Sequence, residues 1–278
     1  MTNDQAHCLC GAHEFDTVFE YTEPPPGEIR FKFTSAGDYR RQLLRCRSCG
    51  HFLSVHAMNA GALYEADYVD STYKADGIGA AFERIVSLPP GKSDNAGRVR
   101  RVLEFASQHF QGDAGLRAGR RIRNVLDVGS GLCVFLNGMK TAGWDCTALD
   151  PDARAAAHAT RHVGVRGIQG EFMTVEHLGR FDVVTLNKVL EHVEDPIALL
   201  SKAAEHLNDD GFVYVEVPDA AGALGEGPHR EEFFIDHLHI FTAASLALLA
   251  SRAGFTVRRT EALREPSGKY TLYAFLAR

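Results

Sequence analysis

The chain has 278 residues, of which 45% are hydrophobic and 24% are charged, and this composition is typical of a globular protein with a buried core. The formal net charge is −6, and residues 121–278, with 16 basic and 21 acidic side chains, contribute 16 − 21 = −5 of it. Nucleic-acid-binding proteins usually present a basic face, so a nucleic-acid partner is not expected. No apolar run reaches the ~18 residues of a membrane helix and no signal peptide is evident, so we expect a cytoplasmic protein without a membrane span.

Residues 1–60 are predicted to form a small, loop-rich metal-binding module. Cys46 and Cys49 are three positions apart and are followed by glycine, a spacing typical of a zinc knuckle. The partner pair is less regular: either Cys8 and Cys10, or His7 and Cys10, could complete the site, and we favour Cys8. Four protein ligands leave no open position, so the zinc would be structural. The alternative is a loop-rich segment with four free cysteines.

Residues 61–118 are expected to form a helical or irregular cap and linker. Within them, apolar residues at helical spacing predict an amphipathic helix over 96–111. Before this segment, alternation of apolar and basic residues over 29–33 is typical of a half-buried strand.

Residues 119–278 are expected to form an α/β domain. Short apolar runs over 124–128, 145–149, 181–186 and 211–217 alternate with helical stretches near 133–142, 152–162 and 196–207. Continuous apolar strands alternating with helices predict a parallel sheet covered on both faces, a Rossmann-like arrangement.

A glycine-rich turn follows the first of these strands. Gly129 and Gly131 would allow a sharp turn and a close approach of a ligand to the backbone. Asp127, just before the turn, suits a cationic amino-acid ligand better than a pyrophosphate. Asp150 follows 150 − 127 = 23 residues later, near the distance at which an acidic residue binds ribose hydroxyls. A nicotinamide cofactor is the alternative, but the third glycine of that fingerprint would fall on Val134.

These motifs resemble those of class I S-adenosylmethionine (AdoMet)-dependent methyltransferases. The segments 125–131, 148–151, 179–196 and 207–218 occur in the order of that family's motifs, and the resemblance covers roughly residues 120–260. At the third small position, usually glycine, stands Cys133, which would leave less room near the methionine part of the cofactor.

The resemblance implies roles for individual residues. Asp127, with the backbone of Gly129 and Gly131, would hold the methionine end of AdoMet, and Asp150 would bind the ribose. Glu171 and Phe172 would flank the adenine. Asn187 would lie beside the methionine carboxylate. A second wall of the site would come from Tyr64, Tyr68, Tyr73, Lys92, Asp94 and Asn95, with Tyr73 as the selected cofactor contact; alternatively, these tyrosines only pack the two parts together.

The acceptor is expected to be a small polar metabolite. The N-terminal cysteines followed by a methyltransferase domain resemble sugar C-methyltransferases of deoxysugar pathways, which implies C- or O-methylation of a sugar or nucleotide-linked sugar. The alternatives are O-methylation of a phenol or quinone-like compound, an RNA methyltransferase guided by the zinc segment, and a binding module that has lost turnover. The sequence leaves the acceptor atom and the oligomeric state open.

Histidines are the candidate bases, since their ordinary pKa lies near neutrality. His239 and His237 follow a Gly/Pro-rich loop over 222–228, a plausible lid, and the segment resembles the substrate-pocket stretch of small-molecule methyltransferases. We select His239 as the base, with His192 as the competing candidate just past the fourth strand. The alternative roles are structural: His192 would orient the following helix, and His239 would cap a helix that begins near Thr242.

Overall fold

The computed structural model describes residues 7–28, 39–56, 77–111 and 122–278. Its centre is a seven-stranded sheet in which neighbouring strands from β8 to β6 run parallel, while β11 pairs antiparallel with β8 and β10 with β11. In spatial order the strands are β10 (Thr256–Arg264), β11 (Tyr270–Ala277), β8 (Leu207–Pro218), β7 (Phe181–Asn187), β4 (Asn124–Val128), β5 (Asp145–Asp150) and β6 (Arg166–Gln169).

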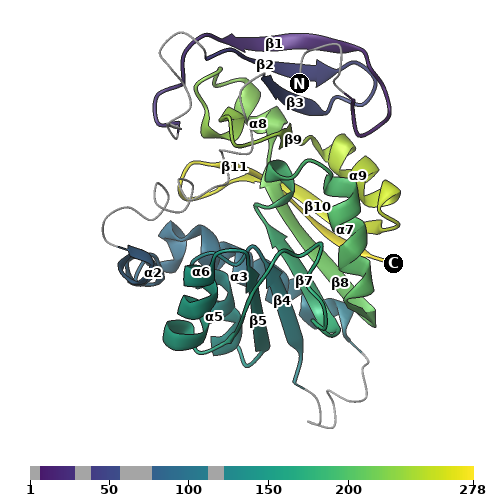
Figure 1. Ribbon diagram of the computed structural model, residues 1–278. Helices are drawn as coiled ribbons and strands as arrows, with labels where there is room; N and C mark the ends of the chain where they lie inside the picture. The colour runs from purple at the N-terminus through teal and green to yellow at the C-terminus, as the bar shows by residue number, and fades with distance from the viewer. Residues whose placement is uncertain (1–6, 29–38, 57–76, 112–121) are drawn as a thin grey trace.

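Helices cover both faces of this sheet (Figure 1). One apolar cluster packs β4 and β5 against α3 (Asp94–His109) and α5 (Val134–Thr141), with Val102, Phe105 and Leu136 at its centre. The other face packs against α7 (Pro196–Glu205) and α9 (Ala243–Arg252). The remaining α-helices of the described residues are α2 (Gly77–Val86), α6 (Ala153–His158) and α8 (Ala220–Leu224).

The N-terminal segment forms a second sheet. Strands β1 (Phe15–Tyr21), β2 (Arg41–Cys46) and β3 (Phe52–His56) pair antiparallel, and β9 (His239–Ile240) completes the sheet at the edge of β3. The module predicted over 1–60 therefore shares its sheet with a strand from the C-terminal part. Figure 1 shows this sheet beside α8, at one end of the larger sheet.

The Rossmann-like fold is confirmed, and the predicted strands at 124–128, 145–149, 181–186 and 211–217 coincide with β4, β5, β7 and β8. The helix predicted over 96–111 is α3, which begins two residues earlier because Ser93 caps it by accepting a hydrogen bond from Ala96 N. The loop expected over 222–228 is partly wrong, since Asp219 caps the short helix α8. The strand expected over 29–33 lies outside the described residues. Within the described ranges, no helix is long and apolar enough to cross a membrane.

Candidate active site

The turn after β4 is built from three backbone positions in the left-handed region. Gly129 has φ +69°, Gly131 has φ +49° and Cys133 has φ +57°. A Cβ on Gly129 would lie 3.0 Å from Val189 Cγ2, so glycine is needed there for space as well as for conformation. The Cys133 side chain is buried in the apolar cluster with Phe135 and is not among the cavity residues given below. The expected crowding of the cofactor by Cys133 is therefore wrong.

Asp150 ends β5 beside this turn. Its Oδ2 accepts a hydrogen bond from Gly131 N at 2.8 Å, and its Oδ1 accepts one from Asp152 N at 2.9 Å. Burial raises the pKa of Asp150, although the two backbone N–H groups act in the opposite direction. The carboxylate is thus fixed at the carboxyl end of the strand, where open α/β sheets bind ligands.

Asp127 lies deeper than the sequence suggested. Its Oδ1 accepts hydrogen bonds from Thr185 Oγ1 at 2.6 Å and from Asn187 Nδ2 at 2.8 Å. Burial raises its pKa to about 6 against the lowering effects of these donors and of Arg98. Asp127 is only 2% exposed and does not line the cavity, whereas Asn187 does. Asp127 therefore orients Asn187, whose Oδ1 is buried without a hydrogen-bond partner among the described residues.

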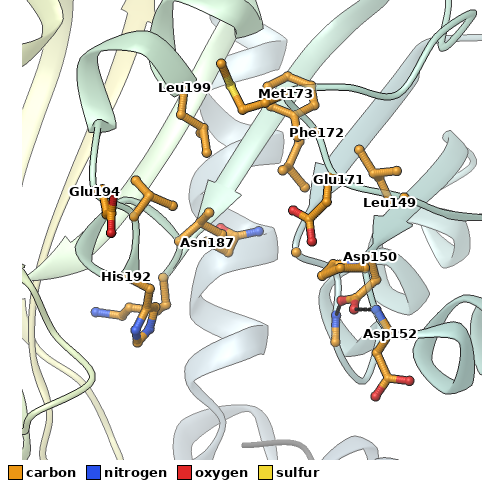
Figure 2. Close-up of a pocket in the computed structure, with 18 of the residues that line it drawn as sticks. Leu149, Asp150, Asp152, Glu171, Phe172, Met173, Asn187, His192, Glu194 and Leu199 are labelled. Carbon is orange, nitrogen blue, oxygen red and sulfur yellow. Dashed lines mark hydrogen bonds between the residues drawn. The ribbon is translucent and has the colours of Figure 1, made fainter. Parts of the chain in front are cut away.

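A cavity of about 950 Å³ opens where β4, β5 and β7 end. In Figure 2, Asp150 and Glu171 lie on one side of Asn187, and His192 and Glu194 lie on the other. The cavity brings together most of the residues that the sequence analysis assigned to the cofactor, together with a wall that follows β7. Its lining is formed by Val128, Gly129, Gly131, Leu149, Asp150, Pro151, Asp152, Ala153, Arg154, Gly170, Glu171, Phe172, Met173, Asn187, Lys188, Val189, His192, Val193, Glu194, Asp195, Ala198 and Leu199.

The predicted second wall is not part of this lining where the structure describes it. The Asp94 carboxylate accepts hydrogen bonds from the backbone N–H and the hydroxyl of Ser267, and Asn95 Oδ1 accepts a hydrogen bond from Arg98 at 2.7 Å. Lys92 does not line the cavity either. The tyrosines of this wall, Tyr64, Tyr68 and Tyr73, lie outside the described residues.

The three candidate histidines divide between two places. His192 lines the cavity, and its ring centroid lies 5.0 Å from that of His237. His239 points elsewhere: it lies in β9, is 7% exposed, and its Nδ1 is 2.9 Å from His51 Nε2. The second nitrogen of His51 is 3.2 Å from Ser245 Oγ, in the first turn of α9. His239 thus contacts α9 through His51, and it does not lie with His192 and His237.

Lys188 is a cavity residue that the sequence analysis missed. It has φ +61°, which is uncommon for a side-chain-bearing residue and marks local strain at the end of β7. Its Nζ lies 3.0 Å from Thr271 Oγ1 and 4.0 Å from Glu216 Oε1. Burial lowers the pKa of Lys188 despite the attraction of Glu216. Only the fold reveals this environment, because the partners come from β8 and β11.

The four N-terminal cysteines converge. The sulfurs of Cys8 and Cys49 are 3.3 Å apart, those of Cys10 and Cys46 are 3.6 Å apart, and all four lie within 4.8 Å of one another. His7 is not in this cluster; its ring packs edge-on against His13. The structure therefore brings Cys8, and not His7, to the other three thiols.

Comparisons with known proteins agree with this geometry. Residues 92–260 match the model of a protein family described as "Methyltransferase domain". The chain belongs to this methyltransferase family. The match begins two residues before α3, so the family's domain includes part of the segment predicted as cap and linker.

Among curated relatives, the ubiquinone biosynthesis O-methyltransferase of Caulobacter vibrioides is 32% identical over 128 residues, which cover 44% of this methyltransferase and 51% of that protein. The enzyme of the same name from Pseudoalteromonas translucida is 29% identical over 163 residues, which cover 51% of this chain and 66% of that enzyme. The chain thus spans about half the length of the first curated relatives it matches.

Among solved structures, the magnesium protoporphyrin IX methyltransferase of Synechocystis, crystallised with S-adenosylhomocysteine, is similar with a TM-score of 0.50 and 14% identity. The likeness covers 76% of this chain and 98% of that one. At this identity it supports the fold alone.

Proposed function

We propose that this methyltransferase transfers the methyl group of AdoMet to a hydroxyl oxygen of an aromatic, quinone-like acceptor. The observation that carries the proposal is the cavity of about 950 Å³. It is lined by Asp150, a carboxylate placed to bind a ribose, and by an apolar wall that also contains His192. Its volume lies at the upper end of the ~300–1,000 Å³ of small-molecule sites, which leaves room for a cofactor and an acceptor.

The residues present fit AdoMet. The Asp150 carboxylate, fixed by two backbone N–H groups, would accept hydrogen bonds from the ribose hydroxyls. Glu171 and Phe172 would flank the adenine. Asn187 Oδ1, an acceptor without a hydrogen-bond partner in the described part of the chain, suits the ammonium group of the methionine part better than its carboxylate. When bound, AdoMet supplies a methyl group activated by the sulfonium.

The wall beyond β7 fits a flat, largely apolar acceptor. Val189, Val193 and Leu199 line it, and apolar side chains stabilise an aromatic ring better than a sugar, whose hydroxyls need hydrogen-bond partners. The named function of the curated relatives also supports the quinone-like alternative over the sugar acceptor expected from the sequence. Because the chain spans only about half of those relatives, their substrate remains part of the proposal.

A hydroxyl acceptor must lose its proton as the oxygen attacks the methyl carbon. We assign this role to the side of the cavity that holds His192, whose side chain is 15% exposed. Its Nδ1 lies 2.8 Å from the backbone oxygen of Asp236, which fixes the ring. His239, bound to His51, serves instead to fix β9 of the N-terminal sheet against α9.

We further propose that Cys8, Cys10, Cys46 and Cys49 hold a structural zinc ion. A tetrahedral ion with Zn–S distances of about 2.3 Å requires sulfurs about 3.8 Å apart, close to the 3.3 Å and 3.6 Å separations of the two pairs.

Transfer of labelled methyl groups from AdoMet to three acceptor classes tests the function. Polyhydroxylated aromatic compounds, nucleotide sugars and total RNA would be compared at equal concentration. The proposal expects turnover with the aromatic class alone. Turnover confined to nucleotide sugars would restore the sugar hypothesis, and turnover on RNA would overturn the small-molecule assignment.

A further inference from the structure

A buried carboxylate next to the cavity is not explained by the fold. Glu191 is 0% exposed, and neither of its carboxylate oxygens has a hydrogen-bond partner among the described residues. An ionised carboxylate without partners in a protein interior costs several kcal/mol. A buried group of this kind therefore indicates that something else neutralises it.

Two imidazoles face this carboxylate. His192 Nε2 lies 4.0 Å from Glu191 Oε1, and ligand atoms of Glu191, His192 and His237 all lie within 4.8 Å of one another. The three residues come from two segments far apart in the sequence. Those segments are tied together by a backbone hydrogen bond of 2.7 Å from Leu238 N to Glu191 O.

The orientation of both rings suits metal binding. His192 Nδ1 lies 2.8 Å from Asp236 O, and His237 Nδ1 lies 2.9 Å from Glu232 O. A carbonyl oxygen only accepts, so each Nδ1 carries the hydrogen and each neutral ring keeps its lone pair on Nε2. A ring held by an Nδ1–H to carbonyl bond is the usual arrangement of a metal-ligating histidine.

We propose that Glu191, His192 and His237 form a binding site for a divalent transition-metal ion at the wall of the cavity. Two imidazole nitrogens and one carboxylate favour ions such as Mn²⁺, Fe²⁺ or Zn²⁺ over Mg²⁺ and Ca²⁺, which prefer oxygen ligands throughout. The ion would offset the buried charge of Glu191. Asp236 Oδ2, 3.9 Å from His192 Nδ1 and 4.0 Å from His237 Nε2, adds a second carboxylate nearby.

The position of the site gives it a use in the reaction. Three protein ligands leave coordination positions open, and His192 lines the cavity where the acceptor would lie. An ion there would favour the deprotonated form of an acceptor hydroxyl, and His192 would then act as a ligand and not as the base. This use rests on the proposed function, whereas the metal site itself does not.

Titration of the full-length protein with Mn²⁺ alone, followed by electron paramagnetic resonance, tests the site. Mn²⁺ is a suitable probe because thiolates select softer ions, so the cysteine cluster does not compete for it. The proposal expects one Mn²⁺ bound per chain without AdoMet or acceptor. Absence of specific Mn²⁺ binding by the wild-type protein would overturn it.

Two variants and a matched control locate the ion. His237→Asn and Glu191→Gln should each weaken Mn²⁺ binding tenfold or more. His177→Asn, at a histidine whose side chain is 94% exposed, should leave it unchanged. Affinity for S-adenosylhomocysteine, measured in parallel, checks that each variant is folded. Equal Mn²⁺ affinity in His237→Asn and wild type would contradict the site. Mn²⁺ binding without O-methylation of any aromatic acceptor would refute the proposed function and leave the site intact.

Discussion

At the residue scale, Asp150 both stabilises the turn after β4 and is placed to bind the cofactor. Its two carboxylate oxygens accept hydrogen bonds from Gly131 N and Asp152 N, so the backbone fixes the carboxylate before any cofactor binds. A group preorganised in this way loses little entropy on binding.

Asp150→Ala should weaken binding of AdoMet and S-adenosylhomocysteine by ~1.5–3 kcal/mol, or roughly 10- to 150-fold, because hydrogen bonds to a charged group are lost. Calorimetry would measure both affinities. Asp145→Ala, at the exposed first position of the same strand, is the matched control and should bind normally. Unchanged affinity in Asp150→Ala would refute the ribose assignment.

Asp127 predicts a specific dependence of stability on pH. Its pKa is raised from 3.8 to about 6, so the folded protein holds this proton more tightly than the unfolded chain. The contribution of Asp127 to the free energy of unfolding is therefore fully present below pH 4 and falls as the pH rises to about 6. A pKa that is higher by about two in the folded state corresponds to a loss on the order of 3 kcal/mol.

Denaturant unfolding of cofactor-free wild type and Asp127→Asn across pH 4–7 checks this dependence. The variant keeps an oxygen that can accept from Thr185 and Asn187 but has no carboxyl proton to lose. The stability of wild type relative to the variant should fall over this pH window. A constant difference would show that Asp127 is not the titrating group.

The histidine assignment is tested by a matched pair. His192→Ala should lower turnover by ~10²–10⁴, because a group that takes part in deprotonation at the cavity is lost. His239→Ala should change turnover much less and should lower the melting temperature, since it breaks the contact with His51. Steady-state kinetics and thermal unfolding of both variants separate these effects. The reverse pattern would restore His239 as the base.

At the element scale, the N-terminal sheet depends on contacts from two directions. Its four thiols lie at one end, where Cys46 closes β2, while β3 pairs with β9 through Phe52 and Leu53. A small sheet of this kind has little core of its own, so a metal ion would supply part of its folding free energy.

Cys46→Ser should release the zinc and increase hydrogen exchange in β1, β2 and β3, because a ligand is lost from a closed site. The strands β4, β5 and β7 should keep their protection. Metal analysis and hydrogen–deuterium exchange measure the two effects. Cys146→Ser, outside the cluster, should retain one zinc per chain. Wild-type protein purified without chelator and free of zinc would contradict the site.

The elements also show what the sequence could predict. Continuous apolar runs identified β4, β5 and β7, because each strand is buried on both faces and its pattern is local. The two-residue strand β9 has no such signal: it exists only because Leu53 and His239, 186 positions apart, pair within the N-terminal sheet. The role of His239 followed from that pairing and could not be predicted. Likewise, the burial of the Glu191 carboxylate without a hydrogen-bond partner among the described residues depends on neighbours far away in the sequence.

At the scale of the whole molecule, a buried ion pair joins the N-terminal sheet to the segment before His237. Arg41 Nη2 lies 3.2 Å from Glu28 Oε1, and the same oxygen accepts a hydrogen bond from Ile235 N at 2.7 Å. Arg41 Nη1 donates to Phe233 O at 2.5 Å. The small sheet therefore supports the loop that carries His237 beside His192, a residue of the cavity wall.

Transfer of a ¹³C-labelled methyl group from AdoMet to a polyhydroxylated aromatic acceptor tests the central claim most directly. Nuclear magnetic resonance of the purified product identifies the atom that carries the label. The account predicts a labelled methyl group on a phenolic oxygen, formed by wild type and strongly reduced in Asp150→Ala at subsaturating AdoMet. A label on carbon or nitrogen, or equal product from both proteins, would contradict it.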